Sequence, residues 1–489
     1  MSIMEDLADA LAKDTIDALD IVGTDELIQD VARVIGASSV TTQEAFLTSA
    51  RVRLSEKRAR VYLEKRIEEA KKGLAASAPR PVPRMTLNID AALPALPDLT
   101  VAEIARLDAQ YAFLMEADRL KTVLRANQLM DRSRFENSAE HSWHAALLAL
   151  LCAPMAGPDV EMSRAIEMLM LHDIVEVDAG DHPIHITHNP ASVAALEEAA
   201  ADRIYGLLPE DLRRRFRATW EEFEAMQSPT ARYAKAIDFL APALQSIGAP
   251  EQDDDERHIV ATNLTQGRAT KTKDILPDLF EFTRAGFYGE AVDATLAARF
   301  AFWCEADRLK SVYRATPIAD GSRKENTGEH SWHIMLYALT LADQAQDGVD
   351  IALAIKMLVL HDIVEIDAGD TPIHGAVTVE AQKAQDEAEI KAADRLFDLL
   401  PPEQGVEFRA IWEEFEAAQT PTAIFAKSID RVQPVLHNLA DDGGSWRTYN
   451  VKLHQLDTRV GTKIAKGCPK LWPYIRSQCE PWFVARGAL

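Results

Sequence analysis

The sequence has few cysteines and no long apolar run. Its four cysteines, Cys152, Cys304, Cys468 and Cys479, include no CxxC pair, so neither a zinc–thiolate site nor a disulfide scaffold is expected. No stretch of 18 or more uncharged apolar residues exists, which disfavours a membrane-spanning helix. The N-terminal Met-Ser-Ile-Met-Glu-Asp lacks the basic and apolar regions of a secretory signal. We therefore expect a cytoplasmic protein without a membrane partner.

Positive charge is also scarce. Lysine and arginine number 53 against 77 aspartates and glutamates, for a formal net charge of −24. A surface this acidic repels polyanions, so binding to extended DNA or RNA is disfavoured. A small anionic substrate is still compatible with this charge, because a metal ion or a local arginine cluster could hold it.

A chain of 489 residues is too long for one hydrophobic core, so we expect several domains. They are an N-terminal helical region, a proline-rich linker, a first repeat, and a second repeat with a C-terminal tail: 1–78, 79–98, 99–285 and 286–489. In the first region Ala8, Leu11 and Ile16 recur at helical spacing. We interpret this region as a scaffold, a dimerisation arm or a partner-binding helix. The tail is expected to pack back on the second repeat.

The repeat is carried by matching stretches of sequence. Leu-His-Asp-Ile-Val-Glu begins at Leu171 and returns 189 positions later at Leu360, followed each time by Asp-Ala-Gly-Asp. Glu-His-Ser-Trp-His precedes each copy, with its first histidine 31 residues before the histidine of the His-Asp pair. Apolar residues recur every three or four positions, and β-branched alternation is scarce. The fold class predicted is therefore all-α, with two tandem helical bundles.

Two histidines and two aspartates recur in each copy. An adjacent His-Asp pair in an apolar run is costly to bury unless it is hydrogen-bonded or holds something charged. Two imidazoles and two carboxylates, brought together from three helices, suit one divalent ion per copy, such as Co, Mn, Fe, Ni, Zn or Mg. The candidate ligands are His141, His172, Asp173 and Asp238 in the first copy and His330, His361, Asp362 and Asp430 in the second.

Residues around the ligands indicate hydrolysis. Glu176 follows His172 by four positions, on the same face of a helix, and Glu365 is its counterpart. A carboxylate there could orient or deprotonate a metal-bound water, whose pKa the metal lowers. Asp181 and Asp370 follow on a loop that could reach the leaving group. Arginines match phosphate groups in geometry and charge, and four of them precede the ligand histidines: Arg125, Arg134, Arg314 and Arg323.

These residues also have ordinary structural interpretations. A single helical histidine is usually a satisfied core or surface residue, and Arg134 could simply pair with Glu136. Recurrence of the whole set, with the 31-residue spacing unchanged, favours the metal site. His144 and His333 recur as well. Because His144 shares a helical face with His141, it could support a ligand from behind or belong to a second metal site.

The pattern His…His-Asp…Asp resembles the HD-domain metal-dependent phosphohydrolases. Asn-Ser-Ala-Glu-His-Ser, Leu-His-Asp-Ile-Val-Glu and Lys-Ala-Ile-Asp are similar to the 5′-deoxynucleotidase branch of that superfamily, present here as a tandem duplication. The resemblance covers roughly 110–245 and 299–440. It implies an all-helical fold with one metal per copy that removes the 5′-phosphate from nucleoside monophosphates. The family is commonly dimeric, so the tandem chain could form a pseudo-dimer internally; further homo-oligomerisation stays open.

The resemblance also implies residue roles. Glu176 and Glu365 would orient or deprotonate the attacking water, and Asp181 and Asp370 would assist the leaving 5′-oxygen. Arg125 and Arg314 would hold the phosphate. The bacterial enzyme of this branch carries a tryptophan directly after that arginine, where this chain has alanine in both copies, so the preference for deoxyribose or ribose stays open.

Two alternative functions are compatible with the sequence. One is hydrolysis of another nucleotide, such as an alarmone or another phosphoester. The other is nucleotide sensing, with one HD copy turned regulatory. The absence of Gly-Tyr-Pro after the His-Asp pair disfavours the branch that acts on cyclic dinucleotides. Because both copies retain every candidate ligand, we predict two competent metal sites per chain.

Overall fold

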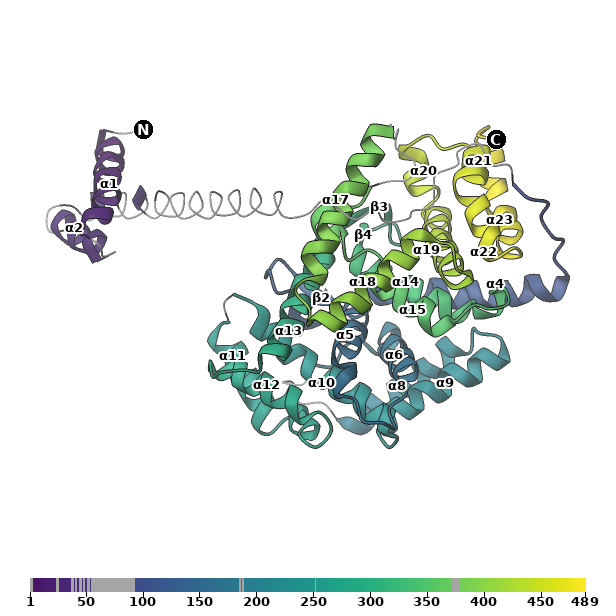
Figure 1. Ribbon diagram of the computed structural model, residues 1–489, viewed down its shortest axis with the longest axis horizontal. Coiled ribbons are helices and arrows are strands. Elements are labelled where there is room, and N and C mark those ends of the chain that lie inside the picture. Colours follow the sequence, from purple (N-terminus) through teal and green to yellow (C-terminus); the bar gives the residue numbers. More distant parts are fainter. Residues whose placement is uncertain are drawn as a thin grey trace. The chain divides into compact units, whose positions relative to one another are not determined.

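The computed structural model describes residues 3–22, 26–36, 93–183, 189–250, 252–371 and 379–489, together with a few single residues between these ranges. It divides the chain into two compact units, residues 1–80 and 81–489 (Figure 1). Of the predicted linker, residues 79–92 lie outside the described residues. Residues 93–98 belong to no helix or strand, and Leu93 and Leu96 pack against the core of the second unit.

The N-terminal unit contains the helices α1 (Ile3–Val22) and α2 (Glu26–Gly36). The predicted helical region is therefore present where the structure describes it. Ala8, Ala12 and Ile16, each four positions from the next, form the buried face of α1, whereas Leu11 is 40% exposed.

The first copy is built mainly of helices. Its elements are α4 (Val101–Ala117), η1 (Asp118–Thr122), β1 (Leu124–Gln128), β2 (Phe135–Asn137), α5 (Ser138–Cys152), η2 (Ala153–Met155), α6 (Met162–Leu171), α7 (Glu176–Ala179), α8 (Pro190–Tyr205), α9 (Glu210–Ala225), α10 (Pro229–Gly248), α11 (Asp254–Thr265), η3 (Arg268–Thr272) and α12 (Pro277–Tyr288).

The second copy repeats the order of the first from α4 to α10 and then adds the tail. Its elements are α13 (Ala294–Asp307), η4 (Arg308–Ser311), β3 (Tyr313–Pro317), β4 (Lys324–Asn326), α14 (Thr327–Thr340), η5 (Ala342–Gln344), α15 (Ile351–Leu360), α16 (Glu365–Ala368), α17 (Val379–Phe397), α18 (Pro402–Ala417), α19 (Pro421–Ala440), α20 (Gly444–Thr448), α21 (Leu453–Leu456), η6 (Asp457–Gly461), α22 (Thr462–Gly467) and α23 (Leu471–Ala485). The tail helices α22 and α23 pack on α19, in the second copy, as expected. The tail also reaches the first copy, where Tyr474 donates a hydrogen bond to Asp108.

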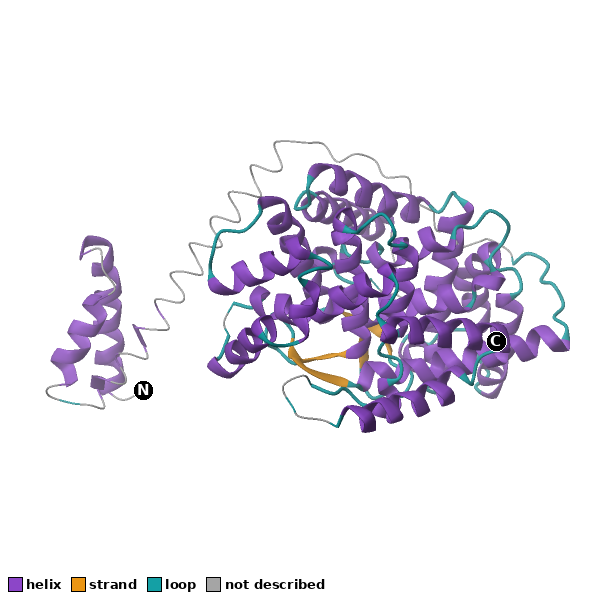
Figure 2. Ribbon diagram, turned by 90° about the horizontal axis from the view of Figure 1, so that it is seen from below, coloured by secondary structure: helices purple, strands orange, loops and turns teal. Residues whose placement is uncertain are grey.

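Each copy also contains a short antiparallel hairpin, β1–β2 or β3–β4, which the sequence did not predict (Figure 2). Strands of three and five residues are too short to show alternation. The first hairpin turns at Arg132, whose φ of 63° is left-handed, and the second copy has Gly321 at this position, with φ 70°. Each hairpin leads directly into a long helix, α5 or α14, so it fixes where that helix begins.

The two copies pack through α5 and α14, and their buried residues form one continuous hydrophobic core. The contact is reciprocal. The Trp143 indole donates to the Val359 carbonyl at 3.0 Å, and the Trp332 indole donates to the Met170 carbonyl at 3.1 Å. The first helix of each copy crosses to the other, since α13 packs on α5 and α4 packs on α14. Within the described part of the chain, no helix combines the length and apolarity needed to cross a membrane.

Candidate metal centre

Three of the four predicted ligands of the first copy meet in its core. His141 lies in the first turn of α5, His172 follows the end of α6, and Asp238 lies in α10. The His141 Nε2 and His172 Nε2 atoms lie 3.3 Å and 3.6 Å from Asp238 Oδ1. One ligand atom from each residue lies within 4.8 Å of the others, a spacing that a single cation could span.

The fourth predicted ligand, Asp173, lies at the edge of this group. Its Oδ1 is 3.0 Å from His172 Nε2, while its Oδ2 accepts a hydrogen bond from Arg125 Nη1 at 2.7 Å. Asp173 thus links the histidine to the candidate phosphate-binding arginine.

The second copy repeats this geometry. His330 Nε2 is 3.3 Å from Asp430 Oδ1, and these two residues form a group with His361 whose ligand atoms lie within 4.8 Å of one another. His361 Nε2 is 2.9 Å from Asp362 Oδ2, which also accepts from Arg314 Nη1 at 2.8 Å.

The His172 and His361 rings are oriented as metal ligands would be. His172 Nδ1 donates to the Leu169 carbonyl at 2.8 Å, and His361 Nδ1 donates to the Leu358 carbonyl at 2.9 Å. In the neutral ring, Nε2 then carries a lone pair, and both Nε2 atoms are buried without a hydrogen-bond partner. A lone pair that faces a buried carboxylate needs a proton or a cation between them. Fixing Nδ1–H on a carbonyl is how proteins orient a metal-bound imidazole, so the donor set fits a divalent cation.

The electrostatics of the first centre indicate the same preference for positive charge. Burial lowers the pKa of His172, but the Asp173 and Asp238 carboxylates outweigh it and raise that pKa to about 10. For Asp238, burial acts upward on the pKa, but the adjacent His141 and His172 rings take it well below its usual range. The two carboxylates therefore stabilise whatever cation sits beside His172.

Glu176 reaches the site by a different route from the one predicted. α6 ends at Leu171 and the chain turns, so Glu176 begins a new helix, α7, rather than continuing the helix of His172. Ser138 Oγ donates to Glu176 Oε2 at 2.6 Å, and Thr327 does the same for Glu365 at 3.0 Å. Burial and the Asp173 carboxylate raise the pKa of Glu176 well above its usual value, which suits a proton acceptor.

Asp181 follows the turn at Gly180, whose φ is 74°. It lies close enough to Arg125 for the guanidinium to act on its pKa, although burial raises that pKa overall. In the second copy Asp370 Oδ1 is 3.9 Å from Arg314 Nη1, and Glu365 Oε1 is at the same distance. The structure therefore gathers the predicted acids around each of these arginines.

Arg134 and Arg323 are placed elsewhere. Arg134 forms two hydrogen bonds with the Glu140 carboxylate, at 2.6 and 2.8 Å, and a third with the Lys310 carbonyl of the other copy. Arg323 does the same with Glu329 and the Lys121 carbonyl. These contacts anchor the hairpin to the opposite copy, so we leave both arginines out of the proposed phosphate-binding set.

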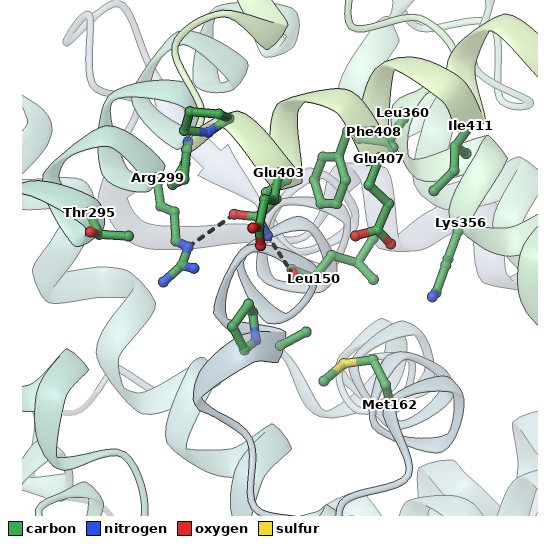
Figure 3. Close-up of a pocket in the computed structure, with 15 residues that line it drawn as sticks. Leu150, Met162, Thr295, Arg299, Lys356, Leu360, Glu403, Glu407, Phe408 and Ile411 are labelled. Carbon is green, nitrogen blue, oxygen red and sulfur yellow. Dashed lines mark hydrogen bonds between the residues drawn. The ribbon is translucent and has the colours of Figure 1, made fainter.

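A cavity of about 540 Å³ is lined by residues of both copies (Figure 3). Arg299 Nε donates there to Gln404 Oε1 at 2.9 Å, and the Gln404 amide reaches the Leu151 carbonyl at 3.2 Å. No predicted ligand lines it. The cavity therefore adds nothing to the metal centre.

A family model described as "HD domain" matches residues 117–280 and 306–472. The chain belongs to the HD domain family. Each matched segment contains one of the two centres, which confirms the predicted tandem arrangement of two HD domains.

Curated relatives within this family carry the name 5′-deoxynucleotidase. The human protein HDDC2 is 29% identical over 135 residues, which are 27% of this chain and 65% of the human protein. The protein YfbR of Shigella flexneri is 28% identical over 182 residues, 35% of this chain and 90% of that protein. The chain thus aligns with slightly less than two thirds of the human protein. The predicted resemblance to the 5′-deoxynucleotidase branch is confirmed.

A solved structure, the predicted metal-dependent phosphohydrolase of Magnetospirillum magnetotacticum, is also similar in sequence. It is 44% identical, covers 40% of this chain and 99% of its own, and superposes with a TM-score of 0.37.

Proposed function

We propose that each HD domain is a metal-dependent phosphohydrolase that removes the 5′-phosphate from ribo- or deoxyribonucleoside monophosphates. The main support is the buried, unpartnered Nε2 of His172 and of His361, which faces aspartate carboxylates beside a buried arginine. The names of the curated relatives support the substrate class.

The proposed ligands in the first domain are His141, His172, Asp173 and Asp238, and their counterparts serve the second. One divalent ion per domain would neutralise phosphate charge and lower the pKa of a bound water. The nitrogen and oxygen donors are compatible with Co, Mn, Fe, Ni, Zn or Mg.

The residues around the proposed ligands would bind the phosphate and transfer protons. Arg125, 12% exposed at its side chain, would donate to phosphate oxygens. Glu176, held by Ser138 and with a raised pKa, would take the proton of the attacking water. Asp181, whose pKa burial also raises, would supply a proton to the leaving 5′-oxygen. Arg314, Glu365 and Asp370 would have these roles in the second domain.

A phosphate-release assay tests the proposal. The purified chain, stripped of metal, is offered 5′-dNMPs, 5′-NMPs, 3′-NMPs and an alarmone, each with Co, Mn, Fe, Ni, Zn or Mg. We expect release from the 5′-monophosphates when a divalent ion is added, and none from the 3′-isomers. Absence of turnover on every 5′-monophosphate would contradict the proposal, and so would equal turnover without metal.

A second experiment distinguishes the proposed phosphate-binding role of Arg125 from the structural role of Arg134. Arg125→Met should lower kcat/KM for a 5′-monophosphate roughly 10- to 100-fold in the first domain, since a hydrogen bond to a charged group contributes about 1.5–3 kcal/mol. Arg134→Met should leave KM unchanged but lower the free energy of unfolding by about 2 kcal/mol or more, because Glu140 stays buried without its cation. Steady-state kinetics in a His361→Ala background and urea unfolding measure the two effects. A raised KM in Arg134→Met would return that arginine to the phosphate site.

A further inference from the structure

Two buried lysines cross between the domains and end behind the opposite metal centre. Lys310, from η4 of the second domain, places its Nζ 2.6 Å from Glu136 Oε1 of the first. Lys121, from η1 of the first domain, places its Nζ 2.7 Å from Glu325 Oε1 of the second. Both lysine side chains are fully buried, so their charges are balanced by these partners rather than by water.

Each glutamate in turn faces a ligand histidine. Glu136 Oε2 is 3.4 Å from His141 Nδ1, and Glu325 Oε2 is 3.3 Å from His330 Nδ1. A carboxylate at Nδ1 fixes the tautomer in which Nε2 carries the lone pair, and Nε2 is the atom that faces Asp238 or Asp430. The chain of contacts therefore runs from a lysine of one domain, through a glutamate, to a proposed metal ligand of the other.

The lysines are themselves held in one position. Lys310 Nζ also donates to Asp307 Oδ1 at 2.6 Å and to His144 Nδ1 at 2.9 Å. His144 Nε2–H donates to the Trp303 carbonyl at 2.9 Å, which leaves Nδ1 free to accept from the ammonium. His144 thus contacts the lysine ammonium behind the first centre.

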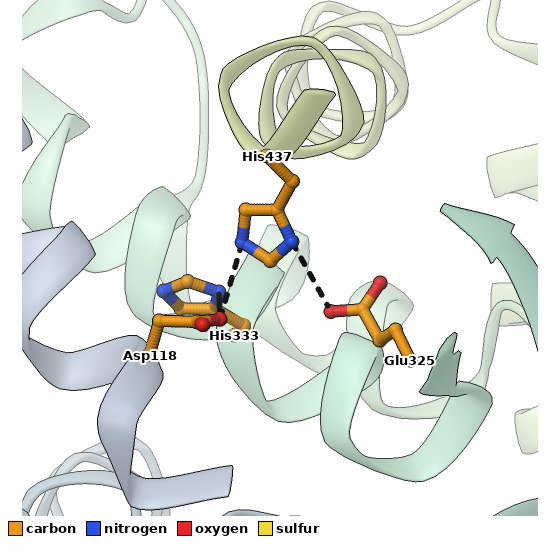
Figure 4. A group of neighbouring side chains, drawn as sticks. All are labelled: Asp118, Glu325, His333 and His437. Carbon is orange, nitrogen blue, oxygen red and sulfur yellow. Dashed lines mark ion pairs between the residues drawn. The ribbon is translucent and has the colours of Figure 1, made fainter. Parts of the chain in front are cut away.

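The second domain has the same network with two additions, Gln433 and His437. Gln433 Nε2 donates to Glu325 Oε1, and Gln433 Oε1 lies 3.1 Å from His330 Nδ1, closer than Glu325 Oε2 does. Asp118, Glu325 and His333 surround Lys121, and His437 joins them, with its Nε2 3.2 Å from Asp118 Oδ1 (Figure 4). These four acids and histidines have the spacing of a metal site. The Lys121 ammonium, however, already contacts three of them and supplies the positive charge, so we assign no second metal there.

We propose that Lys310 and Lys121 are positioning residues that act across the pseudo-dimer, each orienting the glutamate that holds a ligand histidine of the opposite domain. Neither metal centre is then complete without the other domain. This inference rests on the proposed metal sites.

In the first centre, the contacts of Glu136 indicate how the loss of Lys310 would change the orientation of this carboxylate. Glu136 Oε2 lies 3.4 Å from His141 Nδ1 and 3.9 Å from Arg125 Nε, while Oε1 is held by the Lys310 ammonium. Without that ammonium the carboxylate would be free to rotate between His141 and Arg125. The proposed ligand would lose its orientation, and Arg125 would be drawn from the phosphate position.

Cobalt affinity, measured without substrate, tests the inference. His361→Ala leaves the first centre alone in the full-length chain, and His172→Ala leaves the second alone. Lys310→Met and Lys121→Met are each introduced into both parents, and Co²⁺ dissociation constants are obtained by competition with a chromophoric chelator. Each lysine is thus the matched control for the other.

We expect each lysine substitution to weaken Co²⁺ binding only at the centre of the opposite domain. Lys310→Met should weaken Co²⁺ binding at the first centre roughly 10-fold and leave the second unchanged, because it acts through Glu136, and loss of such an outer partner itself costs about 10- to 100-fold. Lys121→Met should do the reverse, with a smaller loss, because Gln433 Oε1 also lies 3.1 Å from His330 Nδ1. Equal losses at both centres, loss at the centre of the lysine's own domain, or no loss would each overturn the inference.

A milder variant keeps the test valid if removing a buried lysine prevents folding. Asp307→Asn preserves the shape of the side chain but weakens its hold on Lys310, and should reduce Co²⁺ affinity several-fold at the first centre alone. An effect at both centres, or at neither, would contradict the inference. Failure of the two parents to bind Co²⁺ would instead overturn the proposed metal centres themselves.

Discussion

Replacing His172 or His361 with alanine should remove one metal ion per chain, and replacing both should abolish turnover. Each ring supplies a buried Nε2 that no other residue replaces, between carboxylates that would repel each other without a cation. We expect metal content to fall from about two ions per chain to one in each single variant. The double variant should lose at least about 10³-fold in turnover, because a bound metal supplies several kcal/mol of transition-state stabilisation.

Elemental analysis of the purified variants measures the stoichiometry, and phosphate release measures turnover per chain. His258→Ala is a matched control, since His258 is exposed on α11 and belongs to neither ligand group. It should change neither quantity. Full activity in His361→Ala with one metal per chain would show that the second domain binds metal without turnover, which would contradict two equivalent active sites.

The ligand geometry was open to prediction because it depends on local spacing repeated twice. His141 and His172 sit at the start of one helix and the end of another, and the interval between them is identical in both copies. Residue types and their recurrence were enough to predict that His141, His172 and Asp238 come together, but not that Asp173 lies at the edge of this group. All-helical architecture followed from apolar periodicity in the same way.

Contacts between the domains were not open to prediction. Lys121 and Lys310 recur in the sequence, but a repeat looks the same whether each lysine serves its own copy or the other. Arg134 was predicted to bind phosphate, whereas the structure places it on Glu140 and on the Lys310 carbonyl, 176 residues away in the other domain. The turn that ends α6 before Glu176 was also missed, since the apolar pattern continues through it and only the backbone hydrogen bonds reveal the break.

Trp143→Ala should lower the stability of both domains at once. Trp143 is fully buried in α5, and its indole donates across the domain contact to the Val359 carbonyl. Truncation leaves a cavity and an unpaired buried carbonyl, at a cost of roughly 3–5 kcal/mol for a large aromatic side chain. Since the domains share one core, we expect residues 93–489 to unfold in urea as a single transition with a lower midpoint.

Two probes with the same unfolding midpoint would show that the transition is single. Helical circular dichroism reports on both domains, and loss of Co²⁺ binding in a His172→Ala background reports on the second domain alone. Trp143→Ala, a change in the first domain, should shift both curves equally. Its indole donates to the Val359 carbonyl of the second domain, two residues before His361. Trp482→Ala, in the tail and partly exposed, should shift both much less. If Co²⁺ binding kept its original midpoint in Trp143→Ala while the circular dichroism midpoint fell, the domains would be energetically independent, and the reciprocal tryptophan contacts would then be packing without coupling.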